Sequence, residues 1–162
     1  MKSFQILAYA FAALIIMMGK AHAEDHKILT VTNDDDGVTY DLFIDADEDM
    51  KANGLKMYDR SEKDWTNFEI SNLSNGALLK EEGSYKVILL KSNDFEPDRG
   101  GHFKVDYLYN GITGSRKEMP VSIDFDGHAW KVFHRGSEIK LLDFRVKKFL
   151  GKTIGIEKVL VK

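Results

Sequence analysis

The sequence contains no cysteine and only two prolines among its 162 residues. Without cysteine no disulfide can form, so the fold must be held by packing and hydrogen bonding. Pro97 lies in a polar stretch and Pro120 opens an alternating apolar run. Both are places where a missing backbone N–H is tolerated, in a loop and at the start of a strand.

Motifs that mark common catalytic centres are also missing. There is no Gly-x-Ser-x-Gly, no His-Glu-x-x-His, no phosphate-binding glycine loop and no cysteine nucleophile. The acidic residues suggest no pair that would face each other across a cleft, as a glycosidase needs. The sequence therefore favours a binding role over catalysis, and it predicts no cofactor.

The first 23 residues have the three parts of a secretory signal peptide. Lys2 supplies the positive charge, residues 4–18 form an apolar run, and Ala21-His22-Ala23 is a small-x-small cleavage site. The apolar run is shorter than the ~20 residues of a membrane-spanning helix. We expect cleavage after Ala23 and a periplasmic or secreted domain over residues 24–162, without a membrane span; retention of the segment as an anchor is the alternative.

Charge is distributed unevenly along this domain. Residues 24–100 contain 19 acidic and 9 basic side chains, a net charge of −10, whereas residues 101–162 contain 7 and 12, a net charge of +5. A nucleic-acid-binding protein requires a dominant basic face. The acidic balance of the whole domain argues against such a partner.

Apolar residues alternate with polar ones at a period of two in most of the chain, which predicts strands. About ten short strands separated by turn residues indicate a single antiparallel β-sandwich, jelly-roll-like, with at most one or two short helices. The expected strands are 27–32, 38–44, 55–58, 66–70, 85–91, 102–109, 119–125, 128–135, 138–146 and 153–161.

Two turn signals predict a meander near the C-terminus. Asp126-Gly127 is a strong two-residue hairpin loop, which would place Phe125 opposite His128. Gly136-Ser137 would form the next loop. The apolar alternation changes phase at Leu141-Leu142, which indicates a bulge or a bend that carries the chain between sheets.

Acidic residues crowd on both sides of the strand expected at 38–44. Asn33 to Gly37 is typical of a hairpin loop, with Gly37 in a left-handed conformation. After the strand, Asp45, Asp47 and Asp49 resemble the beginning of a calcium-binding loop, but Met50 stands where an EF-hand requires glycine. A short capped helix or a polar turn explains this cluster more simply. An irregular calcium site at the three aspartates, completed by another loop, is the alternative.

Aromatic residues in polar surroundings give the better functional signal. Trp65 lies in a polar stretch with no clear buried phase, and Tyr58 lies close to it in the sequence. Tyr and Trp favour half-wet binding surfaces. We therefore expect Trp65 and Tyr58 to bind a glycan or an envelope protein, the alternative being Trp65 as a core residue between the sheets.

Three functions are compatible with these features. The first is an exported, non-catalytic binding module. The second is a polysaccharide-active enzyme with paired carboxylates that the sequence does not identify. The third is a structural or assembly protein of the cell envelope that works by strand pairing. The oligomeric state is open.

Overall fold

The computed structural model describes residues 24–33, 37–82 and 84–162. These residues form twelve strands and one 3-10 helix, so the predicted all-β fold is confirmed. The elements are β1 (Glu24–Asn33), β2 (Val38–Ala46), β3 (Ala52–Asp59), β4 (Asp64–Glu69), η1 (Ile70–Asn72), β5 (Ala77–Glu82), β6 (Tyr85–Lys91), β7 (Gly100–Asn110), β8 (Ser115–Phe125), β9 (Trp130–His134), β10 (Ser137–Ile139), β11 (Leu141–Phe149) and β12 (Lys152–Val161).

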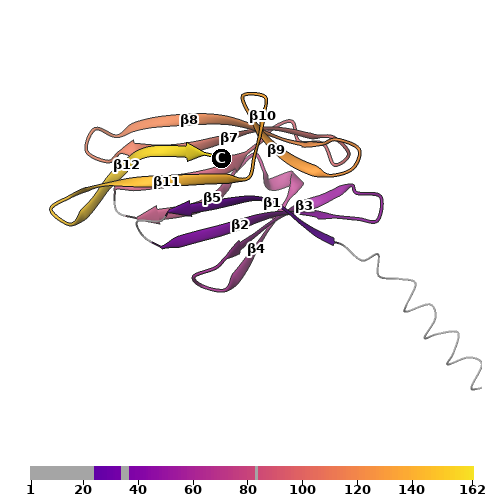
Figure 1. Cartoon of the computed structure of the whole chain (residues 1–162), viewed down its shortest axis with the longest axis horizontal. Helices are drawn as coiled ribbons and strands as arrows, with labels where there is room; N and C mark the ends of the chain where they lie inside the picture. The colour runs from indigo at the N-terminus through magenta and orange to yellow at the C-terminus, as the bar shows by residue number, and fades with distance from the viewer. Residues whose placement is uncertain (1–23, 34–36, 83) are drawn as a thin grey trace, which may run out of the picture.

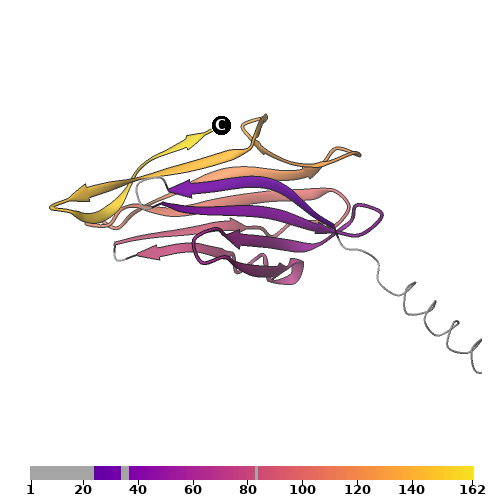
Figure 2. The same ribbon diagram turned by 60° about the horizontal axis from the view of Figure 1, so that its bottom comes forward.

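The strands build two six-stranded sheets that pack face to face (Figure 1). Sheet A has the order β12-β11-β1-β2-β3-β4, and its strands run from yellow β12 at the top to dark violet β4 at the bottom of Figure 2. Sheet B has the order β10-β9-β8-β7-β6-β5. All pairings are antiparallel except that of β1 with β11, which is parallel.

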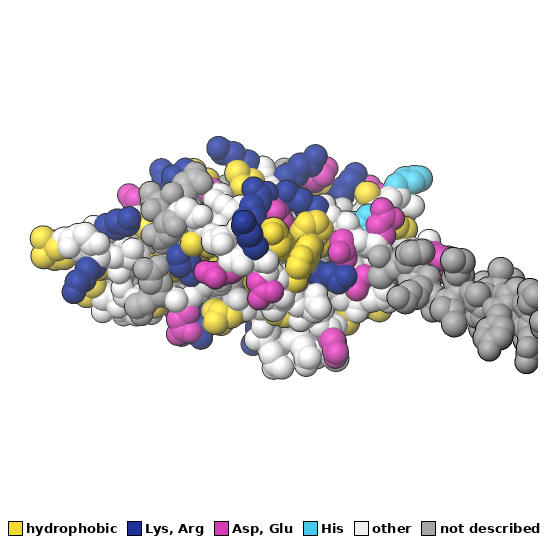
Figure 3. Space-filling model, turned by 90° about the horizontal axis from the view of Figure 1, so that it is seen from below, with side chains coloured by type: hydrophobic (Ala, Val, Ile, Leu, Met, Phe, Trp, Pro, Cys, Tyr) yellow, Lys and Arg dark blue, Asp and Glu magenta, His cyan; other side chains and the backbone are white. Residues whose placement is uncertain are grey.

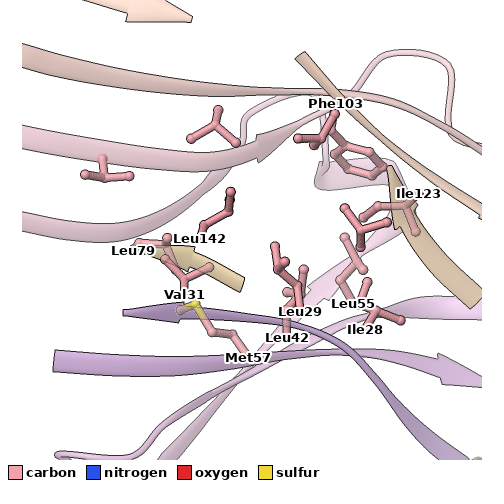
Figure 4. Packing of buried hydrophobic residues seen from close by; sticks show 14 of the residues in the cluster. Ile28, Leu29, Val31, Leu42, Leu55, Met57, Leu79, Phe103, Ile123 and Leu142 are labelled. Carbon is pink, nitrogen blue, oxygen red and sulfur yellow. The ribbon is translucent and has the colours of Figure 1, made fainter. Parts of the chain in front are cut away.

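The core lies between the sheets, where the apolar residues of the two inner faces meet (Figure 4). Leu29, Leu42 and Leu142 from sheet A and Phe103 and Ile123 from sheet B are each at most 1% exposed. Period-two alternation places these residues inward and their polar neighbours outward. Packing of the two sheets thus replaces the disulfides that the chain cannot form.

Successive strands are mostly neighbours within one sheet. The chain completes β1 to β4 in sheet A, then β5 to β10 in sheet B, and returns to sheet A with β11 and β12. A jelly roll instead exchanges strands between its sheets as two Greek keys. The β-sandwich is therefore confirmed, while the jelly-roll order is not. The return occurs at Lys140, next to the phase change at Leu141-Leu142 that predicted it.

Both turns of the predicted meander form, but their registers differ by two residues from the prediction. Phe125 pairs with Trp130 because the Asp126 carboxylate accepts the N–H groups of His128 and Ala129 and thereby closes a longer turn. The next loop is Arg135-Gly136, both with positive φ. A shift of two residues keeps every side chain on its predicted face.

The acidic segment after β2 forms a polar turn, one of the two forms predicted for it, since the chain re-enters a strand at Ala52. Other local predictions were wrong in detail. Strand β5 was not predicted. Pro120 lies in the middle of β8 rather than at its start, on a stretch that pairs only with β7. Gly37 has the expected positive φ of 67°, while residues 34–36 of the same loop and the N-terminal 23 residues lie outside the described residues.

The two sheets meet where β12 crosses the end of β7. The Gly111 N–H donates to the Ile154 carbonyl at 2.6 Å. Gly155 follows with φ +159°, and a Cβ there would lie 2.6 Å from the Tyr109 carbonyl oxygen. Only glycine fits this close approach of two backbones.

Gly155→Ala should lower the free energy of unfolding by about 3 kcal/mol, because the new methyl group meets backbone that cannot move aside and the φ angle disfavours a side chain. Gly114→Ala is the matched control: its φ is +70°, but no atom lies within 4 Å of the added Cβ. This control should lose only about 1 kcal/mol. Urea unfolding of both variants measures the difference, and equal losses would contradict the tight crossing.

Candidate functional site

Three aromatic rings form a row on the outer face of sheet A, across β2, β3 and β4. Register places Tyr58 of β3 directly opposite Trp65 of β4. The ring centroids of Trp65 lie 4.9 Å from Tyr58 and 5.1 Å from Phe43 of β2. The Trp65 ring therefore leans over β3 and contacts both other rings. We call Phe43, Tyr58 and Trp65 the aromatic row.

The row faces solvent, on the opposite side of the sheet from the core. Leu42 and Ile44 flank Phe43 in β2 and are buried inside the sandwich, so alternation directs Phe43 outward. Trp65 is 45% exposed. The alternative that Trp65 lies between the sheets is therefore wrong, and the predicted surface position of Trp65 next to Tyr58 is what the structure shows.

Charged networks lie on both sides of the aromatic row. On one side Asp41 accepts hydrogen bonds from Arg60 Nε at 2.7 Å, Arg60 Nη2 at 2.8 Å and Thr30 Oγ1 at 2.9 Å. Lys27 Nζ lies 2.9 Å from the same carboxylate. The turn that carries Arg60 is tied to β2, because the Arg60 N–H donates to the Thr39 carbonyl. This anchoring directs the guanidinium toward Asp41.

On the other side of the row, Lys56 bridges two aspartates. Lys56 Nζ lies 2.8 Å from Asp25 and 3.5 Å from Asp45. The hydrogen bond to Asp25 is the main cause that raises the pKa of Lys56, so its charge is held at all physiological pH values. Asn67 of β4 stands opposite Lys56 and is exposed. Figure 3 shows the molecule from below, and hydrophobic side chains gather near the middle of this face with basic and acidic side chains around them.

The three aspartates of the candidate calcium site have separate surroundings. Asp45, on β2, pairs with Lys56. Asp47 closes the polar turn, since its carboxylate accepts the N–H groups of Asp49 and Lys51, both at 2.9 Å. The described residues contain no group of three or more His, Asp or Glu side chains arranged to hold a metal ion. Calcium binding by Asp45, Asp47 and Asp49 remains a prediction.

Phe43 and the network around Asp41 were not predicted from the sequence. The signal for Phe43 was available, because the inward phase of Leu42 and Ile44 leaves Asp41 and Phe43 to face outward. No comparable signal existed for Arg60. Its partner Asp41 lies on the neighbouring strand β2, and their approach depends on the register of β2 and β3.

The interior offers no comparable site among the described residues. A cavity lined by Val31, Tyr85 and Phe144 between the sheets has a volume of only about 20 Å³. This volume admits about one water molecule. Any ligand of the aromatic row must bind from outside.

Comparison with known proteins found no matching family model, no matching curated protein and no matching solved structure. Within the part of the chain that the structure describes, no helix has the length and apolar character needed to cross a bilayer.

The Asp41 network gives a pH-dependent contribution to stability. Burial alone would raise the pKa of Asp41, but hydrogen bonds from Arg60, Lys27 and Thr30 outweigh burial and lower the pKa from 3.8 to about 2. A carboxyl group whose pKa is lower in the folded state than in the unfolded chain stabilises the fold at pH values above its pKa in the unfolded chain. The stabilisation is fully present above about pH 4 and is lost as the pH falls through about 2.

Arg60→Gln should therefore lower the free energy of unfolding by about 1 kcal/mol at pH 7, because a largely buried carboxylate loses its bidentate partner. The difference from the unmodified protein should shrink between pH 4 and pH 2. Arg99→Gln is the control, since Arg99 pairs with Glu96 in an exposed loop, where solvent screens the pair, and the substitution should leave stability nearly unchanged. Urea unfolding across this pH range tests the assignment, which a pH-independent loss would contradict.

Proposed function

We propose that this protein is an exported, non-catalytic binding module whose aromatic row binds a glycan. The observation that carries the proposal is the exposed ring of Trp65, supported from below by Tyr58 and Phe43. A sugar ring presents C–H groups on one face, and these pack against the electron-rich face of an aromatic ring. The row provides such a face already in place, so binding requires little ordering of side chains.

The surroundings of the row support a glycan more than a protein partner. Sugar hydroxyls need hydrogen-bonding groups beside the stacked ring, and Lys56, Asn67 and Arg60 lie on the same face of the sheet. The other exposed large apolar side chains lie elsewhere among the described residues: Leu78, Tyr109, Ile112, Phe149 and Leu150. A stable protein interface buries about 800 Å² on each partner. One exposed indole amid polar groups is better matched to one or two sugar rings.

Export is the second part of the proposal and rests on the sequence. Residues 1–23 have the charge, apolar run and Ala21-His22-Ala23 site of a signal peptide. The absence of cysteine and the packed β-sandwich suit a domain that must fold outside the cytoplasm without disulfide formation. We propose a periplasmic or secreted location.

We expect the mature protein to begin at Glu24, because signal peptidase cleaves after the small-x-small site. Intact-mass spectrometry of protein recovered from the exporting cell's periplasm or medium measures this directly. Ala23→Arg, which destroys the small residue at the site, should leave the leader attached. Recovery of the unmodified chain with residues 1–23 still present would show that the segment serves as an anchor.

The other two functions have less support at this surface. An enzyme acting on polysaccharides would bring several acids together in a cleft, but the outer face around the aromatic row commits Asp41, Asp25 and Asp45 to ion pairs with basic side chains. Assembly by strand pairing requires an exposed edge with few charges. One edge of sheet A has that character, and it lies away from the aromatic row.

Trp65→Ala should weaken glycan binding by at least tenfold, about 1.4 kcal/mol, because the stacking surface is removed. The free energy of unfolding should change by less than about 1 kcal/mol, since the ring is half exposed. A glycan array identifies the ligand, and isothermal titration calorimetry then measures the affinity of both proteins.

Two further variants interpret the result. Phe149→Ala removes an exposed ring at the β11–β12 hairpin, 62% exposed, and should leave glycan binding unchanged. Trp130→Ala removes a buried ring and should lower the free energy of unfolding by about 3–5 kcal/mol. The proposal fails if Trp65→Ala binds glycan as well as the unmodified protein, or if no glycan on the array is bound.

A further inference from the structure

A second surface lies at the edge of sheet A opposite to β4, between the edge strand β12 and sheet B. Here a groove of about 720 Å³ separates β12 from the first half of β8 and the end of β9. Fourteen residues line the groove, among them Lys117, Pro120, Arg135, Lys158, Val159 and Val161. These residues come from four strands and one turn, and they include none of the aromatic row.

One wall of the groove is the free edge of β12. Lys162 and Leu141 exchange two backbone hydrogen bonds, of 2.8 and 3.0 Å. In an antiparallel pair such exchange recurs at every second residue. Residues 158 and 160 therefore direct their backbone groups toward β11, while Val159 and Val161 direct theirs away from it. Among the described residues, β12 has no strand partner on that side.

The edge of β12 differs from the other three sheet edges. Strand β10 has three residues, β5 has a register shift within its five-pair ladder, and β4 begins and ends with acidic residues, whereas the two register shifts of β12 both lie before Lys158. Such features protect an edge from pairing. In β12 the pairing from Lys158 to Val161 is regular, and three of these residues are apolar. This stretch is the edge that can accept another strand.

The opposite wall cannot accept a strand as easily. The first half of β8 also has no partner on its groove side, because β9 pairs only with residues 122–125. Pro120 interrupts that stretch and donates no hydrogen bond, and its carbonyl is occupied by His134 Nδ1 at 2.7 Å. A strand that enters the groove therefore pairs with β12 and places its side chains against β8 and β9.

Charge indicates the chemistry of that strand. Four basic residues line the groove, Arg116, Lys117, Arg135 and Lys158, and none of them has an ion-pair partner among the described residues. Lys117 pairs with inward-facing Tyr107 in the register of β7 and β8 and so belongs to the inner face. Of the two acids in the groove, Glu118 is bound to Lys104 at 3.2 Å. The groove presents an excess of positive charge beside unpaired backbone groups.

We propose that this groove binds an extended acidic peptide segment of a partner protein, which adds to sheet A as a strand beside β12. Backbone hydrogen bonds to Val159 and Val161 supply affinity, and carboxylates at alternate positions of the peptide, on the face turned toward sheet B, meet Lys117 and Arg135. Alternation is required because successive side chains of a strand point to opposite faces. The two recognition elements, edge and charge, can be tested separately.

The probes are fluorescent eight-residue peptides with alternating glutamate and threonine, and the same peptide with lysine in place of glutamate. Fluorescence anisotropy with the full protein should show binding of the glutamate peptide and no binding of the lysine peptide. Affinity should fall at least tenfold between 50 and 500 mM salt, because the charges at the groove are partly exposed. Two further glutamate peptides carry N-methyl groups on every second backbone nitrogen, one at the odd positions and one at the even positions. The peptide whose methyl groups block the hydrogen bonds to β12 should bind at least tenfold more weakly than the other.

Variants of the protein complete the test. Val159→Pro removes an edge N–H without removing a bond to β11 and should weaken peptide binding at least tenfold, whereas Val159→Thr retains the N–H and should bind normally. Lys117→Glu with Arg135→Glu should abolish binding of the glutamate peptide. Lys147→Glu with Lys148→Glu is the matched control, exposed and outside the groove, and should bind as the unmodified protein does.

Each contrary outcome overturns a specific part of the proposal. Equal binding of both N-methylated peptides would exclude strand addition, even if Val159→Pro failed to fold. Binding of an anionic polysaccharide that displaces the peptide, unaffected by Val159→Pro, would make the groove an electrostatic site only. Self-association in sedimentation that Val159→Pro abolishes would identify a second copy as the occupant. None of these results depends on Trp65, so the glycan proposal stands or falls separately.

Discussion

The structure depends on one pairing between distant parts of the chain, the parallel contact of β1 with β11. Thr30, Val31 and Thr32 stand beside Leu141, Leu142 and Asp143, and the Thr30 N–H donates to the Lys140 carbonyl at 2.9 Å. This contact joins the last hairpin to the first meander and makes sheet A a single layer. It also fixes β12 over the end of β7, where Gly155 allows the two sheets to approach closely.

Two surfaces of different chemistry result from this arrangement, one near each edge of sheet A. Toward β4, acidic side chains of the first half of the chain are neutralised by Lys27, Lys56 and Arg60, and an aromatic row remains between them. Toward β12, the four basic side chains that line the groove have no ion-pair partner among the described residues. The uneven charge of the sequence thus becomes a difference between the surroundings of the two edges of sheet A. The aromatic row and the groove have no side chain in common.

Predictions from the sequence were most reliable where they depended on local alternation. The sandwich, most strands and the inward faces of β8 and β9 follow from period two and turn residues. The surface position of Trp65 was expected instead from its polar surroundings. Registers were less reliable, because Asp126 closes a longer turn through side-chain hydrogen bonds that no dipeptide rule contains. Strand β5 was missed because its alternation is weak. The groove could not be predicted at all, since it arises from the crossing of β12 over β7, a relation between segments far apart in the sequence.

The parallel pairing also has a kinetic consequence. Thr30 and its partner Leu141 lie 111 residues apart in the sequence, and contacts of such sequence separation slow folding to the range of about milliseconds to seconds. Until β11 joins it, β1 presents an unpaired apolar edge, the kind that other extended chains can occupy. During that interval the protein's own C-terminal hairpin competes with any neighbouring strand for the same position. The speed with which residues 141–161 return to β1 therefore sets how much of the chain escapes mispairing on the way to the native state.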